Sequence, residues 1–501
     1  DSLFENPNHA SPVVMLDDST SWIVHPLYAK GEWKGQGRQG LLNQVRYDAG
    51  GKPVADYPVN QPFTAPRLSS SGIPWMVPKS DFFTSAGLHP EWSFLGYTPA
   101  SKSSLSERPG WLRLSAKSRH KAMTVIKNDG EHNYALITRL DFAPGSTADE
   151  AGLWIVRGDE TMSVKLASSL SSAGKRMINF TFLSAKFETE NSIGDTLWLK
   201  LLRINHSISG WFSGDGVQWT EVGQAVDISQ IDSFSDFTTF TGTRQGLYVA
   251  GSAAAWFDCY IYRDAYSPIL ADWPCNQFGT TRSYNSPGYV LDNIHPNDWA
   301  LYAGVEFGQD EYNRVPDSLK VVASCITTGS RIEVWIDSLD TGRKIADCPI
   351  NHTGGLRTFQ TFASAVAPVS GRHDLYLKFT GTETGKLFQL RLFQFTAVMD
   401  TMTSIQEQPN PARPEQFRLE QNYPNPFNPA TTIEYYLPRS GRTKLSIFNI
   451  KGEEIAILVD GSLPAGTHQI RWDARDIAAG LYLYRLEAGD FMQSKKLAVL
   501  R

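Results

Sequence analysis

Short runs in which hydrophobic and polar residues alternate make up most of the chain, and turns rich in glycine, aspartate, asparagine and proline separate them. Alternation with a period of two places every second side chain on one face of a β-strand. Examples are YALITRLDF, RIEVWID, HDLYLKFTG and KLSIFNI. No segment has the sustained apolar spacing of a long amphipathic helix. The pattern predicts an all-β protein and disfavours α/β folds with their cofactor sites.

The chain has 501 residues, which is too long for a single hydrophobic core. Proline-, serine- and glutamine-rich stretches at residues 60–80 and 403–416 indicate linkers, and a third joint is expected at residues 266–274. The expected pieces are a four-stranded unit at 1–66, a linker at 67–80, a β-sandwich at 81–266, a second at 267–397, a linker at 398–414, and a small β-sandwich at 415–501.

Composition narrows the classes of partner. The net charge is -5, with 47 basic and 52 acidic residues, so no basic surface for nucleic acid or anionic membrane is expected. No apolar run is long enough to span a bilayer, and the first residues, DSLFENPNHAS, have neither the basic nor the apolar region of a signal peptide. The 14 Trp and 19 Tyr suit a core of many strands, and aromatic faces also stack on sugar rings.

The four cysteines, Cys259, Cys275, Cys325 and Cys348, form no CxxC motif and no Cys/His cluster, so a zinc site is not expected. They fit either two local disulfides, 259 with 275 and 325 with 348, or four buried thiols. A GxGxxG pattern at residues 35–40 is followed by no helix and indicates a turn rather than a nucleotide site. We therefore expect no organic cofactor.

The first piece contains NHASPVVMLDDSTSWIVHPLY and GRQGLLNQVRYDAGGKPVADYP, each of which predicts a strand, a turn and a strand. This unit resembles the last blade of the five-bladed propeller of family 43 glycoside hydrolases. The resemblance implies that His9 helps hold a central calcium ion and that Arg38 contacts the substrate sugar; the alternative is that both only satisfy polar ends of the blade. The family's catalytic carboxylates lie in earlier blades, so no catalytic residue is expected in this chain.

The second piece carries HPEWSFLGYTP, SERPGWLRL, DEAGLWIV and RQGLYVAG in order, and resembles the concanavalin-like C-terminal domain of family 43 xylosidases. The resemblance implies a structural β-sandwich. Within it, FSGDGVQW predicts a tight hairpin turn at Asp215 and Gly216, after which Trp219 returns to the core.

The third piece, with GYVLDNIHPNDWALYAGVEFG, a Thr-Gly-Gly turn and a closing Phe-Gln-Phe, resembles a family 6 carbohydrate-binding module. Xylan-binding members hold a sugar between two aromatic rings and fix it with an amide. Tyr289 matches the first ring, Phe359 replaces the second because Leu356 stands at its usual place, and Gln389 stands where the amide is usually Asn. The alternative is a sandwich without a working cleft.

The fourth piece contains NYPNPFNP, NIKGEEI and AGLYLYRL and resembles the C-terminal sorting domain of the type IX secretion system, a small immunoglobulin-like β-sandwich. The resemblance implies that residues 415–501 are read by that secretion machinery. The chain is then carried through a bacterial outer membrane and is secreted or attached to the cell surface.

Together these resemblances predict the C-terminal, accessory portion of a secreted glycoside hydrolase that acts on xylan or arabinoxylan. Its own tasks would be structural support, carbohydrate binding and export. Two alternatives stay open at this point: a non-catalytic cell-surface protein for carbohydrate binding or adhesion, and an enzyme whose site the sequence does not reveal.

Overall fold

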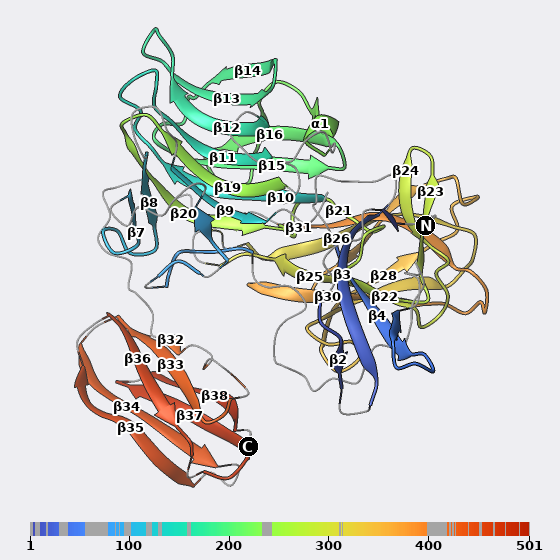
Figure 1. The fold of residues 1–501 in the computed structure, drawn as a ribbon. Coiled ribbons are helices and arrows are strands. Elements are labelled where there is room, and N and C mark those ends of the chain that lie inside the picture. The colour runs from blue at the N-terminus through green and yellow to red at the C-terminus, as the bar shows by residue number, and fades with distance from the viewer. Residues whose placement is uncertain are drawn as a thin grey trace. The chain divides into compact units, whose positions relative to one another are not determined.

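A computed structural model shows that the chain is built almost entirely from β-strands (Figure 1). It describes residues 4–5, 11–16, 19–29, 39–55, 79–85, 87–89, 91–94, 102–116, 123–128, 133–157, 162–232, 243–309, 312, 314–397, 418–419, 422, 425, 427–438, 440–449, 453–463, 466–475, 477–489 and 491–499. These residues form two compact units, one up to residue 397 and one from residue 418. In this part of the chain one short helix, α1 (Ser229–Asp232), accompanies the strands. The predicted all-β class is confirmed.

The N-terminal residues form one antiparallel sheet. Its strands are β1 (Phe4–Glu5), β2 (Val14–Met15), β3 (Ser21–Ala29), β4 (Gln39–Tyr47) and β5 (Pro53–Ala55). The order is β1-β3-β4-β5, with β2 also paired to β3. Trp22 and Val45 are buried, whereas Val14, Met15 and Val24 are exposed. The described part of this sheet therefore leaves several apolar side chains exposed.

The next domain is a sandwich of two antiparallel sheets. One sheet has the order β17-β16-β15-β10-β20-β8-β7, with β18 paired to β16, and the other has the order β14-β13-β12-β11-β19-β9-β6. The first sheet contains β7 (Ser103–Ser104), β8 (Leu112–Ser115), β10 (Asn133–Asp141), β15 (Thr196–Ile204), β16 (Ser207–Ser213), β17 (Thr220–Glu221), β18 (Val226–Asp227) and β20 (Ala254–Tyr262). The second contains β6 (Ser93–Phe94), β9 (Met123–Asn128), β11 (Glu150–Arg157), β12 (Met162–Leu170), β13 (Arg176–Phe182), β14 (Ala185–Glu190) and β19 (Thr243–Ala250).

Side chains that alternate along these strands fill the space between the two sheets. Leu153 and Ile155 of β11 point into this core. Trp154, between them, is also buried and stacks on Tyr248 at 5.3 Å between ring centroids. β16 and β17 form the predicted hairpin, but pairing ends at Phe212 and Thr220, so residues 213–219 form a longer loop than the predicted tight turn. Asp215 Oδ1 holds this loop by accepting the backbone N–H groups of residues 217 and 218. Trp219, however, packs against a cluster outside this core, so its predicted return to the core is wrong.

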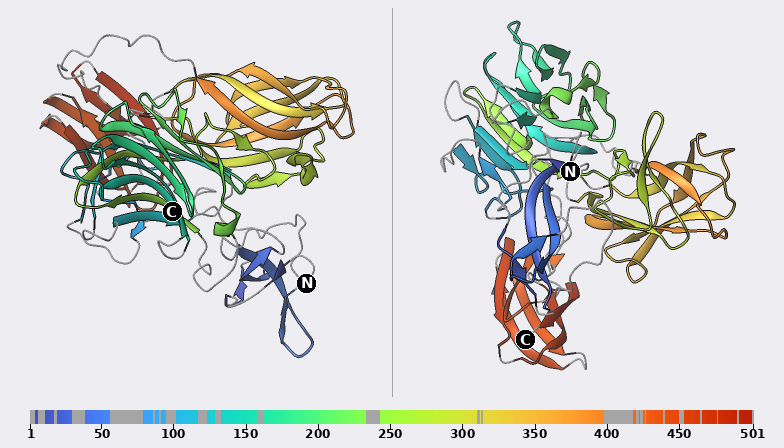
Figure 2. Two further views of the ribbon diagram at one scale, coloured as in Figure 1. Left: turned by 90° about the horizontal axis from the view of Figure 1, so that it is seen from above. Right: turned by 45° about the vertical axis from the view of Figure 1, so that its right-hand side comes forward.

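The following domain is a second sandwich, whose two layers are visible in yellow to orange in Figure 2. One sheet has the order β23-β24-β31-β26-β29, with β21 paired to β31, and the other has the order β22-β25-β30-β27-β28. The first sheet contains β21 (Ile269–Leu270), β23 (Thr281–Asn285), β24 (Gly288–Asp292), β26 (Pro316–Cys325), β29 (Gln360–Ala365) and β31 (Phe388–Ala397). The second contains β22 (Asn276–Phe278), β25 (Trp299–Glu306), β27 (Ser330–Ile336), β28 (Arg343–Ile350) and β30 (Arg372–Thr380).

All four cysteines are free thiols. Cys259, Cys325 and Cys348 are buried, and burial raises the pKa of the Cys259 thiol well above its ordinary value. Cys275 is exposed, and its sulfur accepts a bond from Arg263 at 3.3 Å. The structure therefore contains neither of the two local disulfides and agrees with the buried-thiol alternative at three of the four positions.

A buried cluster joins the two sandwiches. Tyr312 of the second sandwich lies with Trp198 and Ile261 on the outer face of a sheet of the first, and its ring is 5.5 Å from that of Trp198. Its hydroxyl donates to Asp264 Oδ1 at 2.5 Å. Gly308 keeps this loop close, since a Cβ at that position would lie 1.9 Å from the Tyr312 carbonyl oxygen. The second sandwich thus covers an apolar sheet face of the first.

The C-terminal unit has two sheets, ordered β32-β33-β36 and β35-β34-β37-β38. Its strands are β32 (Arg418–Leu419), β33 (Ala430–Leu437), β34 (Gly441–Asn449), β35 (Glu454–Leu463), β36 (Gly466–Asp473), β37 (Gly480–Ala488) and β38 (Phe491–Val499). Buried and partly exposed side chains alternate along β33, so this strand has one buried face. Ile433, Leu445 and Tyr484 are among the buried residues between the two sheets.

The described residues of NYPNPFNP, at positions 422–429, close an edge of this unit. Asn425 donates from Nδ2 to the Lys496 carbonyl oxygen at 3.2 Å and accepts the Ala498 N–H on Oδ1 at 2.8 Å. Phe427 N donates to the Ala498 carbonyl oxygen at 3.0 Å, and its ring packs 5.7 Å from that of Trp472. One amide side chain thus serves a donor and an acceptor of β38, the two groups that an edge strand leaves open.

No helix in the described part of the chain is long and apolar enough to cross a bilayer.

The joint between the sandwiches predicts a pH dependence of stability. Burial raises the pKa of the Glu306 carboxyl to about 7 from its ordinary 4.5, against the bond from the Gly308 N–H and the nearby Arg372. Between these pH values the folded chain holds a proton that the unfolded chain has lost, so the free energy of unfolding falls as pH rises. Glu306→Gln replaces the carboxyl with an amide that does not ionise in this range. The variant is therefore expected to be about 3 kcal/mol more stable than wild type at pH 8, with no difference at pH 4.

Urea unfolding at both pH values measures this effect. Glu91→Gln, at an exposed position, is the matched control and should follow wild type throughout. Equal pH profiles for wild type and Glu306→Gln would show that folding does not raise the pKa of this carboxyl.

Candidate functional site

The hairpin of β23 and β24 carries the predicted first ring. Its strands pair so that Tyr284 lies directly opposite Tyr289, and the two rings meet edge to face at 5.4 Å. Tyr289 is 38% exposed although its neighbour Val290 is fully buried. An aromatic ring left this open at the end of a sheet can receive the apolar face of a ligand.

The other two predicted residues come from different parts of the same domain. Phe359 is half-buried just before β29, and Gln389 is buried near the start of β31. Asn285, at the end of β23, joins these parts: its Nδ2 donates to Gln389 Oε1 at 2.6 Å and to the Leu356 carbonyl oxygen at 2.7 Å. The structure therefore brings the Tyr289 hairpin, the segment that leads to Phe359, and Gln389 together around one amide.

Arg391 fastens the hairpin to Phe359. On β26, Val322 pairs with Leu392 and Ala323 with Leu390, so Arg391 is the extra residue of a β-bulge. Bulges of this kind redirect a side chain. Its guanidinium lies 3.7 Å from the centroid of the Phe359 ring, and Nη2 donates to the Asn285 carbonyl oxygen at 3.1 Å. The alternating sequence around Arg391 gives no sign of this bulge, so sequence reasoning missed it.

Sequence reasoning also missed Arg282, which contacts the first ring. Its guanidinium lies 3.6 Å from the centroid of Tyr289 and 4.8 Å from that of Trp273. Its Nε donates to Asp272 Oδ2 at 2.9 Å, and the Asp272 side chain is almost fully buried. One face of Tyr289 is thus occupied by a fixed cation, which leaves the ring oriented for contact on its other side.

The hairpin itself carries a second polar group, at the end of β24. Asp292 on β24 accepts a bond from Ser283 Oγ at 2.8 Å and forms an ion pair with Lys386. Burial alone raises the pKa of Asp292, but the bonds from Lys386, Ser283 and Gln389 outweigh it and hold the pKa below its ordinary value. Gln389 therefore contacts both Asn285 and Asp292, and its predicted contact with a ligand stays a prediction.

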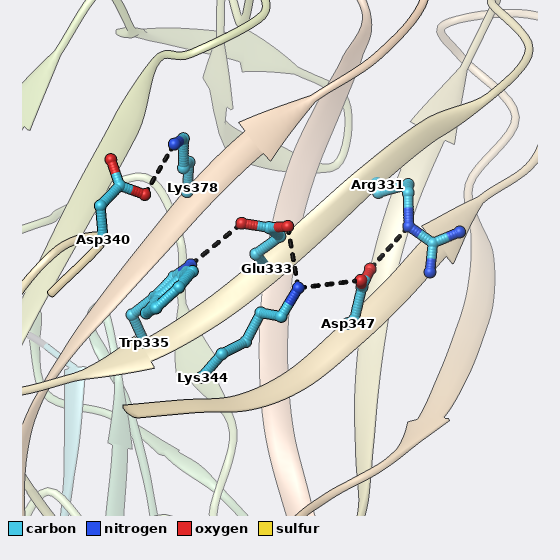
Figure 3. Close-up of polar contacts among 7 residues, drawn as sticks. All are labelled: Arg331, Glu333, Trp335, Asp340, Lys344, Asp347 and Lys378. Atoms are coloured by element: carbon cyan, nitrogen blue, oxygen red, sulfur yellow. Dashed lines mark hydrogen bonds and ion pairs between the residues drawn. The ribbon is translucent and has the colours of Figure 1, made fainter. Parts of the chain in front are cut away.

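The outer face of the other sheet has a different character (Figure 3). The side chains drawn there are Arg331, Glu333, Trp335, Asp340, Lys344, Asp347 and Lys378. Arg331 Nε donates to Asp347 Oδ1 at 2.6 Å. Lys344 Nζ bonds Glu333 at 3.0 Å and Asp347 at 3.4 Å. Because these charges already pair with one another, the hairpin with its exposed ring is the better candidate site.

Two predicted residues of the first piece, His9 and Arg38, lie outside the described residues. The predicted calcium contact of His9 and the sugar contact of Arg38 therefore stay predictions. Within the described ranges, no three side chains of His, Cys, Asp or Glu come close enough to hold a metal ion.

Three stretches of the chain match known families. Residues 80–263 match the beta xylosidase C-terminal concanavalin A-like domain, residues 276–397 the family 6 carbohydrate binding module, and residues 421–500 the secretion system C-terminal sorting domain. The chain therefore carries these three domains in this order, and their predicted resemblances are confirmed. The sorting domain marks a protein of the type IX secretion route, which is secreted or attached to the cell surface.

The individual relatives are named for xylan or arabinoxylan. The chain is 33% identical over 121 residues to the arabinoxylan arabinofuranohydrolase of Bacillus subtilis (strain 168), which covers 23% of this chain and 22% of the relative. It is 29% identical over 158 residues to a xylan 1,3-beta-xylosidase of Vibrio sp, and this match covers 29% of this chain and 30% of the relative. A solved xylan beta-1,4-xylosidase from Bacillus halodurans C-125 is 24% identical, with a TM-score of 0.46 over 52% of this chain and 54% of that one. Each curated match thus spans less than a third of the relative.

The bonds of Asn285 predict a structural effect at the site. Asn285→Ala removes the donor that Leu356 and Gln389 share. The buried Gln389 Oε1 loses this bond, whereas the Leu356 carbonyl oxygen still accepts Ser324 Oγ at 2.8 Å. We expect a loss of about 1–3 kcal/mol in the free energy of unfolding, measured by urea titration. Asn351→Ala, at an exposed position, is the control and should change stability by less than about 0.5 kcal/mol. Equal stabilities of the two variants would contradict the linking role of Asn285.

Proposed function

We propose that this chain is the C-terminal, accessory portion of a secreted glycoside hydrolase that acts on xylan or arabinoxylan, and that residues 267–397 bind the polysaccharide around Tyr289. The observation that carries the proposal is the exposed Tyr289 ring on a hairpin braced by Asn285 and Arg391. It supports binding because an open, rigidly held ring loses little side-chain entropy when a sugar stacks on it.

The ligand contacts follow from this geometry. Tyr289 supplies the open stacking ring. Phe359, backed on one face by Arg391, supplies the second ring. Gln389 contributes to binding by holding Asn285 in place, because its Oε1 accepts an N–H of Asn285 Nδ2. Sugar hydroxyls then meet amide groups while sugar C–H faces meet aromatic rings, which is how proteins bind neutral carbohydrates.

Residues 1–66 are proposed to close a propeller of which they form one blade. Their exposed apolar side chains, Val14, Met15 and Val24, support a neighbouring partner sheet. In that setting His9 would contribute to a calcium site, and Arg38 would contact the sugar. The concanavalin-like domain is proposed to support this propeller. Hydrolysis itself is assigned to carboxylates that this chain does not supply.

Affinity electrophoresis of the full chain in gels containing soluble xylan or arabinoxylan tests the binding proposal. Wild type should be retarded, and Tyr289→Ala should lose most of the retardation because the stacking ring is gone. Phe278→Ala, at an exposed aromatic residue on the other sheet, is the matched control and should behave as wild type.

Two results would count against the proposal. If neither xylan nor arabinoxylan retards the chain, residues 267–397 form a structural sandwich without a binding cleft. Release of xylose or arabinose by this chain alone would show that it contains a catalytic site and is more than an accessory portion.

Export supplies a separate prediction. In a bacterium with type IX secretion, the chain fused behind a Sec signal peptide should reach the cell surface or the medium. The same fusion lacking residues 415–501 should stay in the periplasm, because the sorting domain has been removed. Immunoblots of the cell fractions measure this, with a periplasmic protein as the leakage control. Equal export of both fusions would contradict the sorting role.

A further inference from the structure

An exposed aromatic strip adjoins the candidate site. It consists of Trp273, Tyr289 and Tyr284, which are 41%, 38% and 65% exposed. Trp273 and Tyr284 were not singled out from the sequence, and neither belongs to the predicted pair of rings. Soluble domains seldom leave several neighbouring aromatic side chains open to water, and such patches usually mark a binding surface.

The strip is held in place by charged and aromatic contacts. Arg282 lies between two of its rings, 4.8 Å from the centroid of Trp273 and 3.6 Å from that of Tyr289. The guanidinium is fixed through Nε by Asp272 at 2.9 Å. Tyr284 meets Tyr289 on the next strand at 5.4 Å. The three rings therefore form one connected surface that is organised before any ligand arrives.

We propose that Trp273 and Tyr284 extend the carbohydrate-binding surface on either side of Tyr289, so that the module grips several consecutive sugars of a chain rather than one terminal sugar. This inference rests on the proposed function, because Tyr289 must bind sugar for its neighbours to add contacts. Each added ring offers an apolar face to a further sugar unit.

The geometry also selects the physical form of the ligand. The planes of Tyr284 and Tyr289 make an angle of 78°, so these rings cannot both lie against one flat surface. Crystalline polysaccharide presents such a flat surface, whereas a single dissolved chain can turn from one sugar to the next. The strip therefore suits a soluble, twisted chain.

Isothermal titration of the full chain with xylobiose through xylohexaose tests the proposal. For wild type, we expect the affinity to rise at least about tenfold from the shortest to the longest oligosaccharide, as each added contact lowers Kd. Trp273→Ala and Tyr284→Ala should each bind xylobiose like wild type but lose much of the rise with length. Tyr289→Ala should bind poorly at every length.

Controls separate stacking from folding. Trp273→Phe and Tyr284→Phe keep a ring and should keep the rise, whereas a folding defect would not be rescued by ring size alone. Phe278→Ala removes an aromatic side chain that is 62% exposed on the other sheet, and it should bind like wild type. Wild type should also sediment poorly with crystalline cellulose.

The outcomes distinguish this inference from the proposed function. A wild-type affinity that does not grow with length, or a rise that persists in both alanine variants, would overturn the extended surface while Tyr289 still binds. Strong binding to crystalline cellulose would overturn the twisted geometry. Failure of wild type to bind any oligosaccharide or polysaccharide would overturn both the proposed function and this inference.

Discussion

A protein made of sheets must cover apolar faces and close strand edges, and this constraint accounts for most of what the structure shows. The outer face of one sheet in the first sandwich is apolar at Ile137 and Ile261, and Tyr312 from the next domain covers it. The last strand of the chain would be an open edge, and Asn425 bonds its backbone on both sides of Leu497. Exposed aromatic side chains that remain after such covering, as on the β23–β24 hairpin, are therefore informative about binding.

The joint between the sandwiches shows what this covering costs. Asp264 accepts a bond from Tyr312 on Oδ1 and one from Ser267 on Oδ2 at 2.6 Å, so both of its carboxylate oxygens are hydrogen-bonded within the interface. Glu306 is less well compensated, and its pKa is raised to about 7 by burial. Lys200 also faces this region, and burial lowers its pKa to about 8. The two sandwiches thus share apolar contacts at the expense of poorly solvated charges, which is typical of buried ionisable groups.

The sequence predicted the fold better than the site. Alternation is read from neighbouring positions, whereas a cleft is formed by residues that lie far apart in the sequence. Alternation in RIEVWID predicted a strand with one buried face, and β27 agrees, since Ile332, Val334 and Ile336 are buried. The same rule cannot anticipate β11, which is buried on both faces since Trp154 stacks on Tyr248 from a strand almost a hundred positions away in sequence. Tyr289 was found because its motif is recognisable. Arg391 was missed because a bulge depends on register with β26.

The two arginines explain why the candidate site could be only half foreseen. A ring motif predicts that an aromatic side chain is present, but not which of its faces is free. Arg282 occupies one face of Tyr289, and Arg391 one face of Phe359, at nearly equal distances of 3.6 and 3.7 Å. Each guanidinium is also tied to the protein, by Asp272 or by the Asn285 carbonyl. A planar, anchored cation suits this task better than a lysine, because it stacks and donates in fixed directions at once. One face of each ring is thereby covered by a side chain that no motif names.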